Sequence, residues 1–280
     1  MTLYARVPTK ILMYDVKMDG ATGAQDRSAW FEPKKQLKIE NPFINLPYII
    51  DHERDGLIVS QTNACMSYMG RRLGLWGRSE KDVAMCETFL AEVMDLRNQM
   101  TGFSYRGDPS YEKTKEDGLA LLNTVLGKSS SLRKFELHFK NKWEEGGETI
   151  QVPADRVNIP SEGAQMNAKP FLLDYCTAPD FHLFEMCSQF ADLCDWCGGG
   201  MNQKFIMELP YVTEFYTSFQ WLEGMQEYFK SELHHGTPFN NKAARFGSIP
   251  SSVKLKAGEN MAFKKGQDYD WGVQERFFNC

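Results

Sequence analysis

The apolar pattern of the chain changes at Ser79. Before this residue, short apolar segments alternate with turn-forming residues, whereas after it apolar residues recur at helical spacing from Val83 to Phe103. Strands and helices followed only by helices are typical of a small α/β unit joined to an all-α unit. The sequence therefore predicts two structural parts, and 280 residues are enough for both.

The N-terminal part, residues 1–77, is expected to begin with a strand over Lys10 to Met18, where apolar residues alternate. A helix is expected at 28–38, followed by two strands at 45–51 and 57–60. A second helix opens at 61–63 and ends near Gly74, because glycine is common just after a helix.

The C-terminal part, residues 78–247, is expected to be all-α. After the first long helix, further helices are expected at 109–127, from 130 onward, at 178–196 and at 210–232. Glycine, proline and charged residues fill 141–168, which predicts a long loop or insertion. Residues 248–280 show little periodicity and are expected to form an irregular tail. Its basic and aromatic side chains fit either a docking segment or a loose surface tail.

Composition excludes several classes of protein. The net charge of −5 argues against a nucleic-acid-binding protein, which would usually be basic. No run of 18 or more apolar residues exists, so no membrane span is expected. Seven cysteines, an odd number, fit a reducing compartment. A cytoplasmic protein is therefore expected, or an organellar one if a targeting segment has been removed.

Cys194 and Cys197 have the two-residue spacing of redox and metal-binding pairs. They lie at the end of an expected helix, not at the start of one, where a thiol pKa would be lowered. A zinc site would need two further ligands, so buried thiols are the favoured interpretation and no metal is expected.

Several motifs occur in a characteristic order along the chain. They are Asn45-Leu-Pro-Tyr-Ile-Ile-Asp51, Ser60-Gln-Thr-Asn-Ala64, Met94-Asp-Leu-Arg97 and Thr177-Ala-Pro-Asp180. Together they resemble motifs of the glutathione transferases, and Trp30 with Lys34 is similar to the mu class in particular. The resemblance covers about residues 3–247 except the insertion, and it implies a thioredoxin-like N-terminal domain, an all-helical C-terminal domain and a dimer.

The resemblance implies a glutathione site in the N-terminal domain. Pro47 is expected in a cis peptide bond, with the main chain of Leu46 pairing with the cysteinyl part of glutathione as an added strand would. Gln61 and Thr62 are at a helix start, where free N–H groups favour the γ-glutamyl carboxylate.

The rest of the implied site involves both parts of the chain. Trp30, Lys34 and Asn45 are expected to hold the glycyl carboxylate. Asp95 is expected to meet the γ-glutamyl amine across the dimer interface, and Tyr105 is the candidate catalytic residue, facing the electrophile.

Each of these residues also has a plain structural interpretation. Pro47 could mark a strand entry, Trp30 could be a packed aromatic, and Gln61 with Thr62 could simply begin a helix. Likewise, Asp95 could be on a solvated helix face and Tyr105 in the core.

The resemblance has one large gap. Family members begin with a strand, a turn carrying the catalytic hydroxyl and a helix, whereas Leu3 to Pro8 here resembles only the end of that helix. About 20 residues are therefore expected to be missing, which would leave a vacant sheet edge.

The leading functional prediction is glutathione transfer to a hydrophobic electrophile, as in detoxification, or glutathione-dependent isomerisation or reduction. The alternative is a catalytically inactive subunit that binds a partner protein through the tail or the vacant edge.

Overall fold

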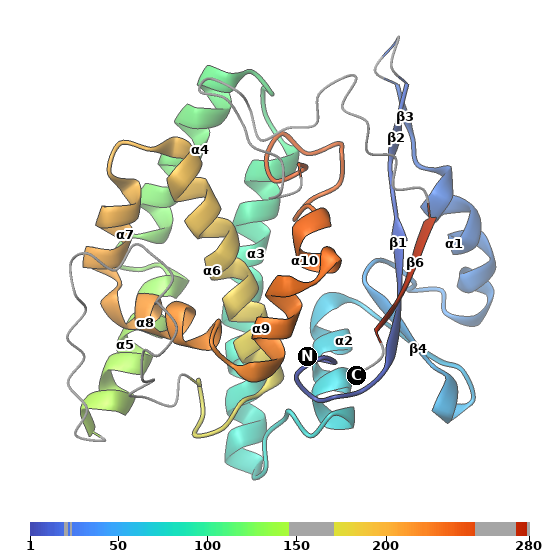
Figure 1. Cartoon of the computed structure of the whole chain (residues 1–280), viewed down its shortest axis with the longest axis horizontal. Helices are drawn as coiled ribbons and strands as arrows, with labels where there is room; N and C mark the ends of the chain where they lie inside the picture. The colour runs from blue at the N-terminus through green and yellow to red at the C-terminus, as the bar shows by residue number, and fades with distance from the viewer. Residues whose placement is uncertain (20–21, 23, 146–170, 250–272, 279–280) are drawn as a thin grey trace.

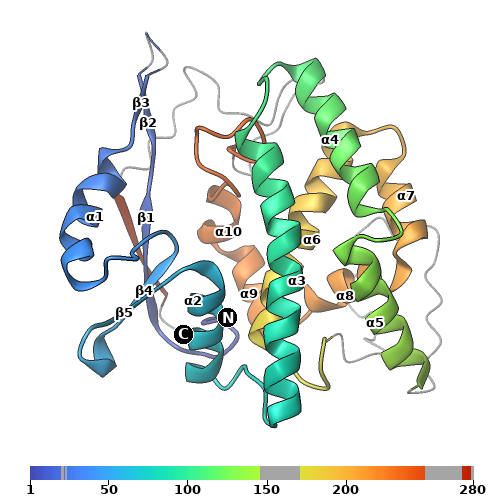
Figure 2. The same ribbon diagram turned by 180° about the vertical axis from the view of Figure 1, so that it is seen from behind.

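The computed structural model describes all residues except 20–21, 23, 146–170, 250–272 and 279–280. A small α/β part lies beside a larger helical part, and the long helix α3 (Glu80–Tyr105) runs along the boundary (Figures 1 and 2). This arrangement confirms the expected fold class.

The α/β part contains short strands and two helices. It comprises β1 (Thr9–Tyr14), β2 (Lys17–Met18), β3 (Gln25–Asp26), α1 (Ser28–Glu40), β4 (Tyr48–Asp51), a 3-10 turn (His52–Arg54), β5 (Leu57–Ser60) and α2 (Thr62–Arg72). The single strand expected from Lys10 to Met18 is divided into β1 and β2. The buried residues Asp15 and Val16, which lie between them, belong to neither strand.

The strands form three two-stranded sheets among the described residues: β1 with β6 (Val273–Phe278), β2 with β3, and β4 with β5. The β1–β6 pair is antiparallel, from Thr9 opposite Phe278 to Tyr14 opposite Val273 (Figure 1). The tail was expected to be irregular, so β6 corrects that expectation for six residues. A segment far away in the sequence supplies hydrogen-bonding partners to β1.

The helical part contains α3 and seven further helices within the described residues. They are α4 (Tyr111–Val125), α5 (Ser131–Glu145), α6 (Ala178–Cys197), α7 (Met201–Glu208), α8 (Pro210–Phe219), α9 (Glu223–Lys230) and α10 (Glu232–Gly236).

Three details differ from the sequence-based expectation. Helix α5 continues to Glu145, into the segment 141–168 that was expected to be a loop; residues 146–168 lie outside the described residues. Helix α7 was not predicted. The single helix expected over 210–232 is divided into α8 and α9, with α10 beginning at its last residue. The chain turns before Gly224, where α9 meets the N-terminal residues so closely that a Cβ would lie 2.5 Å from the Cα of Tyr4.

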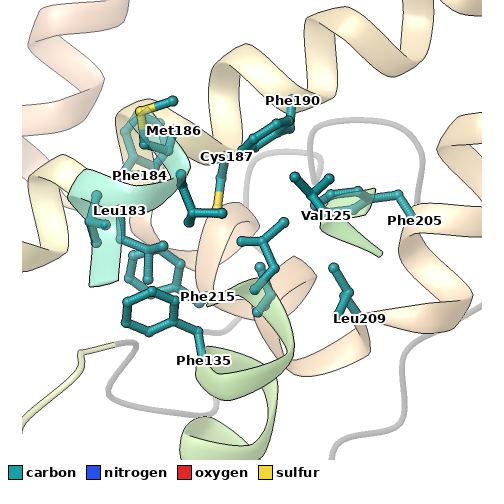
Figure 3. Close-up of a cluster of buried hydrophobic side chains, with 14 of the residues drawn as sticks. Val125, Phe135, Leu183, Phe184, Met186, Cys187, Phe190, Phe205, Leu209 and Phe215 are labelled. Carbon is teal, nitrogen blue, oxygen red and sulfur yellow. The ribbon is translucent and has the colours of Figure 1, made fainter. Parts of the chain in front are cut away.

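Helix α6 lies at the centre of the hydrophobic core. Its Leu183, Met186 and Phe190 are buried against side chains from α4, α5, α7 and α8, which converge around it in Figure 3. Aromatic rings fill much of this space, with Phe139 stacked on Phe215 at 5.0 Å. Burial of this many large apolar side chains is the main force holding the helical part together.

A buried carboxylate fixes the start of α6. Asp180, fully buried, accepts hydrogen bonds from the main-chain N–H groups of Leu172 and Thr177, both at 2.7 Å, and from the Thr177 hydroxyl. The expected structural role of the Thr177–Asp180 motif is therefore confirmed. Burial raises the pKa of Asp180 to about 6, against the opposing effect of these hydrogen bonds.

The segment 239–248 links the two parts of the molecule. Lys242 forms an ion pair of 2.5 Å with Asp15, and both side chains are less than 10% exposed. Arg245 donates to the main-chain oxygen of Phe103 at 2.8 Å and pairs with Asp117 at 2.7 Å. Both contacts are polar and largely buried, which gives this segment a defined place between β1 and α3.

Asp180→Ala should lower the free energy of unfolding by about 2–5 kcal/mol, because two buried N–H groups lose their acceptor. Urea denaturation measures this change. The control is Asp174→Ala, at a side chain 90% exposed, which should change stability by less than about 0.5 kcal/mol. Equal effects of the two substitutions would refute the structural role of Asp180.

Lys242→Met should destabilise the protein by about 3–5 kcal/mol, because it removes the cation beside the buried carboxylate of Asp15. Adding Asp15→Asn should restore part of that loss, since the uncompensated charge is then gone. Chemical denaturation of the two single variants and the double variant gives the coupling energy. Strictly additive effects would contradict a direct ion pair.

Candidate functional site

A pocket of about 260 Å³ lies between the α/β part and the helical part. Its position is set by the segment 239–248, which contributes one wall. The lining residues are Tyr14, Asp15, Val16, Arg27, Trp30, Phe31, Leu46, Tyr105, Asn241 and Ala243. Three of the predicted site residues, Trp30, Leu46 and Tyr105, are therefore brought together.

On the α/β side the pocket is lined by the aromatic side chains of Tyr14, Trp30 and Phe31, and Tyr48 packs beside the first two. The ring of Trp30, only 9% exposed, stacks on Tyr48 at 5.8 Å and meets Tyr14 at 5.2 Å. The hydroxyls of Tyr14 and Tyr48 are hydrogen-bonded at 2.6 Å. Burial and this bond raise the pKa of Tyr48, so its hydroxyl stays protonated at neutral pH.

The loop before β4 presents unused main-chain groups. The Leu46–Pro47 peptide bond is cis, as predicted. Asn45 N–H donates to Ser60 Oγ at 2.8 Å, and Gln61 N–H donates to the Pro47 oxygen at 3.3 Å. Between them, neither the N–H nor the C=O of Leu46 bonds to another described residue. Leu46 thus offers a donor and an acceptor beside the pocket.

Helix α2 begins directly after this loop. Gln61 has a φ of 79°, a value that is costly for a residue with a side chain and is often found at functional sites. No side chain caps the helix, so the first N–H groups after Thr62 are available to an anion.

Lys34 and Asn45 lie together beside Trp30. The Lys34 ammonium is 3.4 Å from Asn45 Oδ1 and 5.5 Å from the centre of the Trp30 ring. The three residues predicted to share a carboxylate are therefore neighbours, with the ammonium and the amide at the surface.

The two predicted residues on α3 have different surroundings. Tyr105 lines the pocket with 41% of its surface exposed, and its hydroxyl accepts the N–H of Asn241 at 3.1 Å. Partial burial raises the pKa of Tyr105. Asp95 is exposed and does not line the pocket. Its expected role involves a second copy of the chain and stays a prediction.

Sequence reasoning missed several pocket residues, including Tyr14, Arg27 and Asn241. Tyr14 was recognised only as part of a strand, and no local signal indicated which way its side chain points. Asn241 is 136 residues from Tyr105. Asn241 reaches the pocket only because the segment 239–248 folds back against α3, and no sequence motif indicated this path of the chain.

The Cys194–Cys197 pair does not form a second site. Both are free, buried thiols at the end of α6, and burial raises their pKa to about 12 and 11. Within the described part of the chain, no cluster of three His, Cys, Asp or Glu side chains is arranged to hold a metal. Nor is any helix in that part both long and apolar enough to cross a membrane.

Similar proteins are found by sequence and by structure, although no protein-family model matches the chain. Glutathione S-transferase Mu 1 of Rattus norvegicus is 26% identical over 223 residues, which cover 80% of this chain and 81% of the relative. Glutathione S-transferase Mu 3 of Homo sapiens is 25% identical over 226 residues, 80% of this chain and 79% of the relative.

A shorter match has a higher identity: glutathione S-transferase Mu 6 of Mus musculus is 36% identical over 108 residues, covering 37% of this chain and 47% of the relative. The crystal structure of the glutathione S-transferase Blo t 8 shares the fold, with a TM-score of 0.57, 19% identity and coverage of 80% of this chain and 84% of that chain. The chain is therefore similar in sequence to mu-class glutathione S-transferases over four fifths of its length, and it shares the glutathione S-transferase fold.

Proposed function

We propose that this chain binds glutathione beside the pocket and joins it, through its sulfur, to a hydrophobic electrophile. The observation that carries the proposal is the main chain of Leu46, which pairs with no described residue and lies between the start of α2 and the Lys34–Asn45 pair. A tripeptide with a carboxylate at each end needs a main-chain partner in its middle and an anion site at either end.

The roles of the residues follow from these contacts. The start of α2, with Gln61 and Thr62, would hold the γ-glutamyl carboxylate, and Leu46 would pair with the cysteinyl unit. Trp30, Lys34 and Asn45 would hold the glycyl carboxylate through the indole N–H, the ammonium and the amide. Asp95 would complete the γ-glutamyl end from a second subunit of a homodimer.

The reaction needs a thiolate and a place for the electrophile. The pocket supplies the hydroxyls of Tyr14 and Tyr105 and the guanidinium of Arg27. A donor or a positive charge near the sulfur lowers the thiol pKa. The thiolate would then attack the electrophile, which would be held by the aromatic wall and Tyr105. Conjugation of this kind would serve detoxification in the cytoplasm.

A catalytically inactive family member is the second candidate. It is favoured by the hydrogen bond between the Tyr14 and Tyr48 hydroxyls, because this bond occupies one of the hydroxyls in the pocket. The pocket is also slightly below the usual range of ligand sites, about 300–1,000 Å³. Such a protein would retain glutathione binding and contact a partner protein.

Glutathione should bind with a dissociation constant below about 1 mM. Lys34→Met should weaken binding at least about tenfold, since a charge-assisted hydrogen bond contributes about 1.5–3 kcal/mol. Lys38→Met, on the exposed surface of the same helix, is the matched control and should change little. Calorimetry measures all three. Absence of binding heat at millimolar glutathione, or an equal loss of glutathione affinity in both variants, would contradict the proposed glutathione site.

Tyr105→Phe should lower kcat/KM for an aromatic electrophile about tenfold and leave the glutathione affinity unchanged, because Tyr105 is assigned to the electrophile and not to glutathione. Steady-state kinetics with calorimetry separates the two effects. Wild-type protein that binds glutathione but shows no turnover would support the inactive candidate, and full activity in Tyr105→Phe would exclude Tyr105 as the catalytic residue.

A further inference from the structure

A second and larger cavity, of about 820 Å³, lies within the helical part. Its walls come from α6, α7, α8, α9 and α10 and from residues 237–239 (Figure 1). It shares no residue with the pocket between the two parts. Its volume is within the range that accommodates a drug-sized ligand.

Three carboxylates from one helix face this cavity: Glu185, Asp192 and Asp195 of α6. Glu185 accepts a hydrogen bond from Gln189 at 3.0 Å, and Asp195 accepts one from Asn202. Asp192, which is half-buried, makes no hydrogen bond or ion pair with any described residue. Among the described residues, no lysine or arginine lines the cavity, so none of them supplies an ammonium or guanidinium to offset this negative charge.

The electrostatic environment of Asp192 is unfavourable for a carboxylate. Burial, together with the negative charges of Asp195 and Glu185, raises the pKa of Asp192 to about 6. At pH 7.5 the group is still mostly ionised, and a nearby cation would remove the repulsion.

The opposite walls of the cavity are aromatic. Tyr216 of α8 and Phe229 of α9 both line it, and each ring also packs on Phe184 of α6. Aromatic faces attract organic cations when the charge is held within about 6 Å of the ring. In addition, the buried Thr237 Oγ1 lines the cavity without a hydrogen-bond partner in the described chain.

We propose that this cavity binds an organic cation, an amine with an apolar body, with its charge against Asp192, within the longer-range field of Glu185, and its body against Tyr216 and Phe229. A metal ion fits less well. Glu185 and Asp192 are seven residues apart on α6, about 10 Å along the helix axis, so they cannot share one ion directly. The proposal does not depend on glutathione binding.

Three probes with one carbon skeleton test the charge requirement: 4-phenylbutylammonium, 4-phenylbutanol and 4-phenylbutyrate. Calorimetry on the full chain at pH 7.5 should show the cation binding at least tenfold more tightly than the alcohol, and no binding of the carboxylate. Equal binding of cation and alcohol, preference for the carboxylate, or no binding of the cation would overturn the proposal.

Substitutions locate the binding site. Asp192→Asn and Glu185→Gln should each weaken cation binding about fivefold or more and leave the alcohol unaffected. The control Asp174→Asn removes an equal charge at an exposed site and should change nothing. Two separate variants are used so that loss of folding in one leaves the other informative. Unchanged cation affinity in a folded variant of either residue would place the cation elsewhere.

The pH dependence provides a third readout. Lowering the pH from 7.5 to 5.5 adds a proton to Asp192, whose pKa is about 6, and burial also raises the pKa of Glu185. His234 and His235 lie on the facing wall. Asp195 is the third carboxylate that lines the cavity. The added protons make the cavity less negative, so cation affinity should fall severalfold. An affinity that rises or stays constant would contradict binding at this site.

Discussion

The candidate site depends on the buried ion pair between Lys242 and Asp15. Asp15 directly follows β1, and Lys242 belongs to the segment that contributes Asn241 and Ala243 to the pocket. A buried ion pair is stable only if its geometry is well defined, so this contact fixes the distance between the strand and the segment. Arg245 extends the same connection to α3 and to Asp117 of α4. The pocket therefore lies where the α/β part meets the helical part, and a few buried charged side chains hold the two parts together there.

The second fixed point is Asp180 at the start of α6. It ties the residues before the helix to its first turn, and α6 then carries the core on its apolar faces and Glu185 and Asp192 on the face toward the second cavity. One helix thus supports both the packing of the molecule and an unusual concentration of negative charge. Since burial of uncompensated charge opposes stability, a ligand that neutralises it would also stabilise the fold.

Much of the fold was predictable from local patterns. The helices 28–40, 62–72, 80–105 and 178–197 have clear periodicity or start signals, and the site motifs around Leu46, Gln61 and Trp30 are close in sequence. What could not be predicted depends on long-range contacts. The β1–β6 pairing joins residues that are about 260 positions apart in the sequence, such as Tyr14 and Val273. The break between α8 and α9 lies beside the close contact of Gly224 with Tyr4. Neither contact leaves a signal in the local sequence.

Glutathione, as we propose, is held by the Leu46 main chain between the start of α2 and the Lys34–Asn45 pair. A crystal structure of the protein with bound glutathione would show these contacts. We expect two hydrogen bonds of about 2.9 Å between the cysteinyl unit and Leu46, with the glycyl carboxylate at Lys34 and the γ-glutamyl carboxylate at the first N–H groups of α2. Glutathione bound elsewhere, or bound here without contact to Leu46, would contradict the proposal.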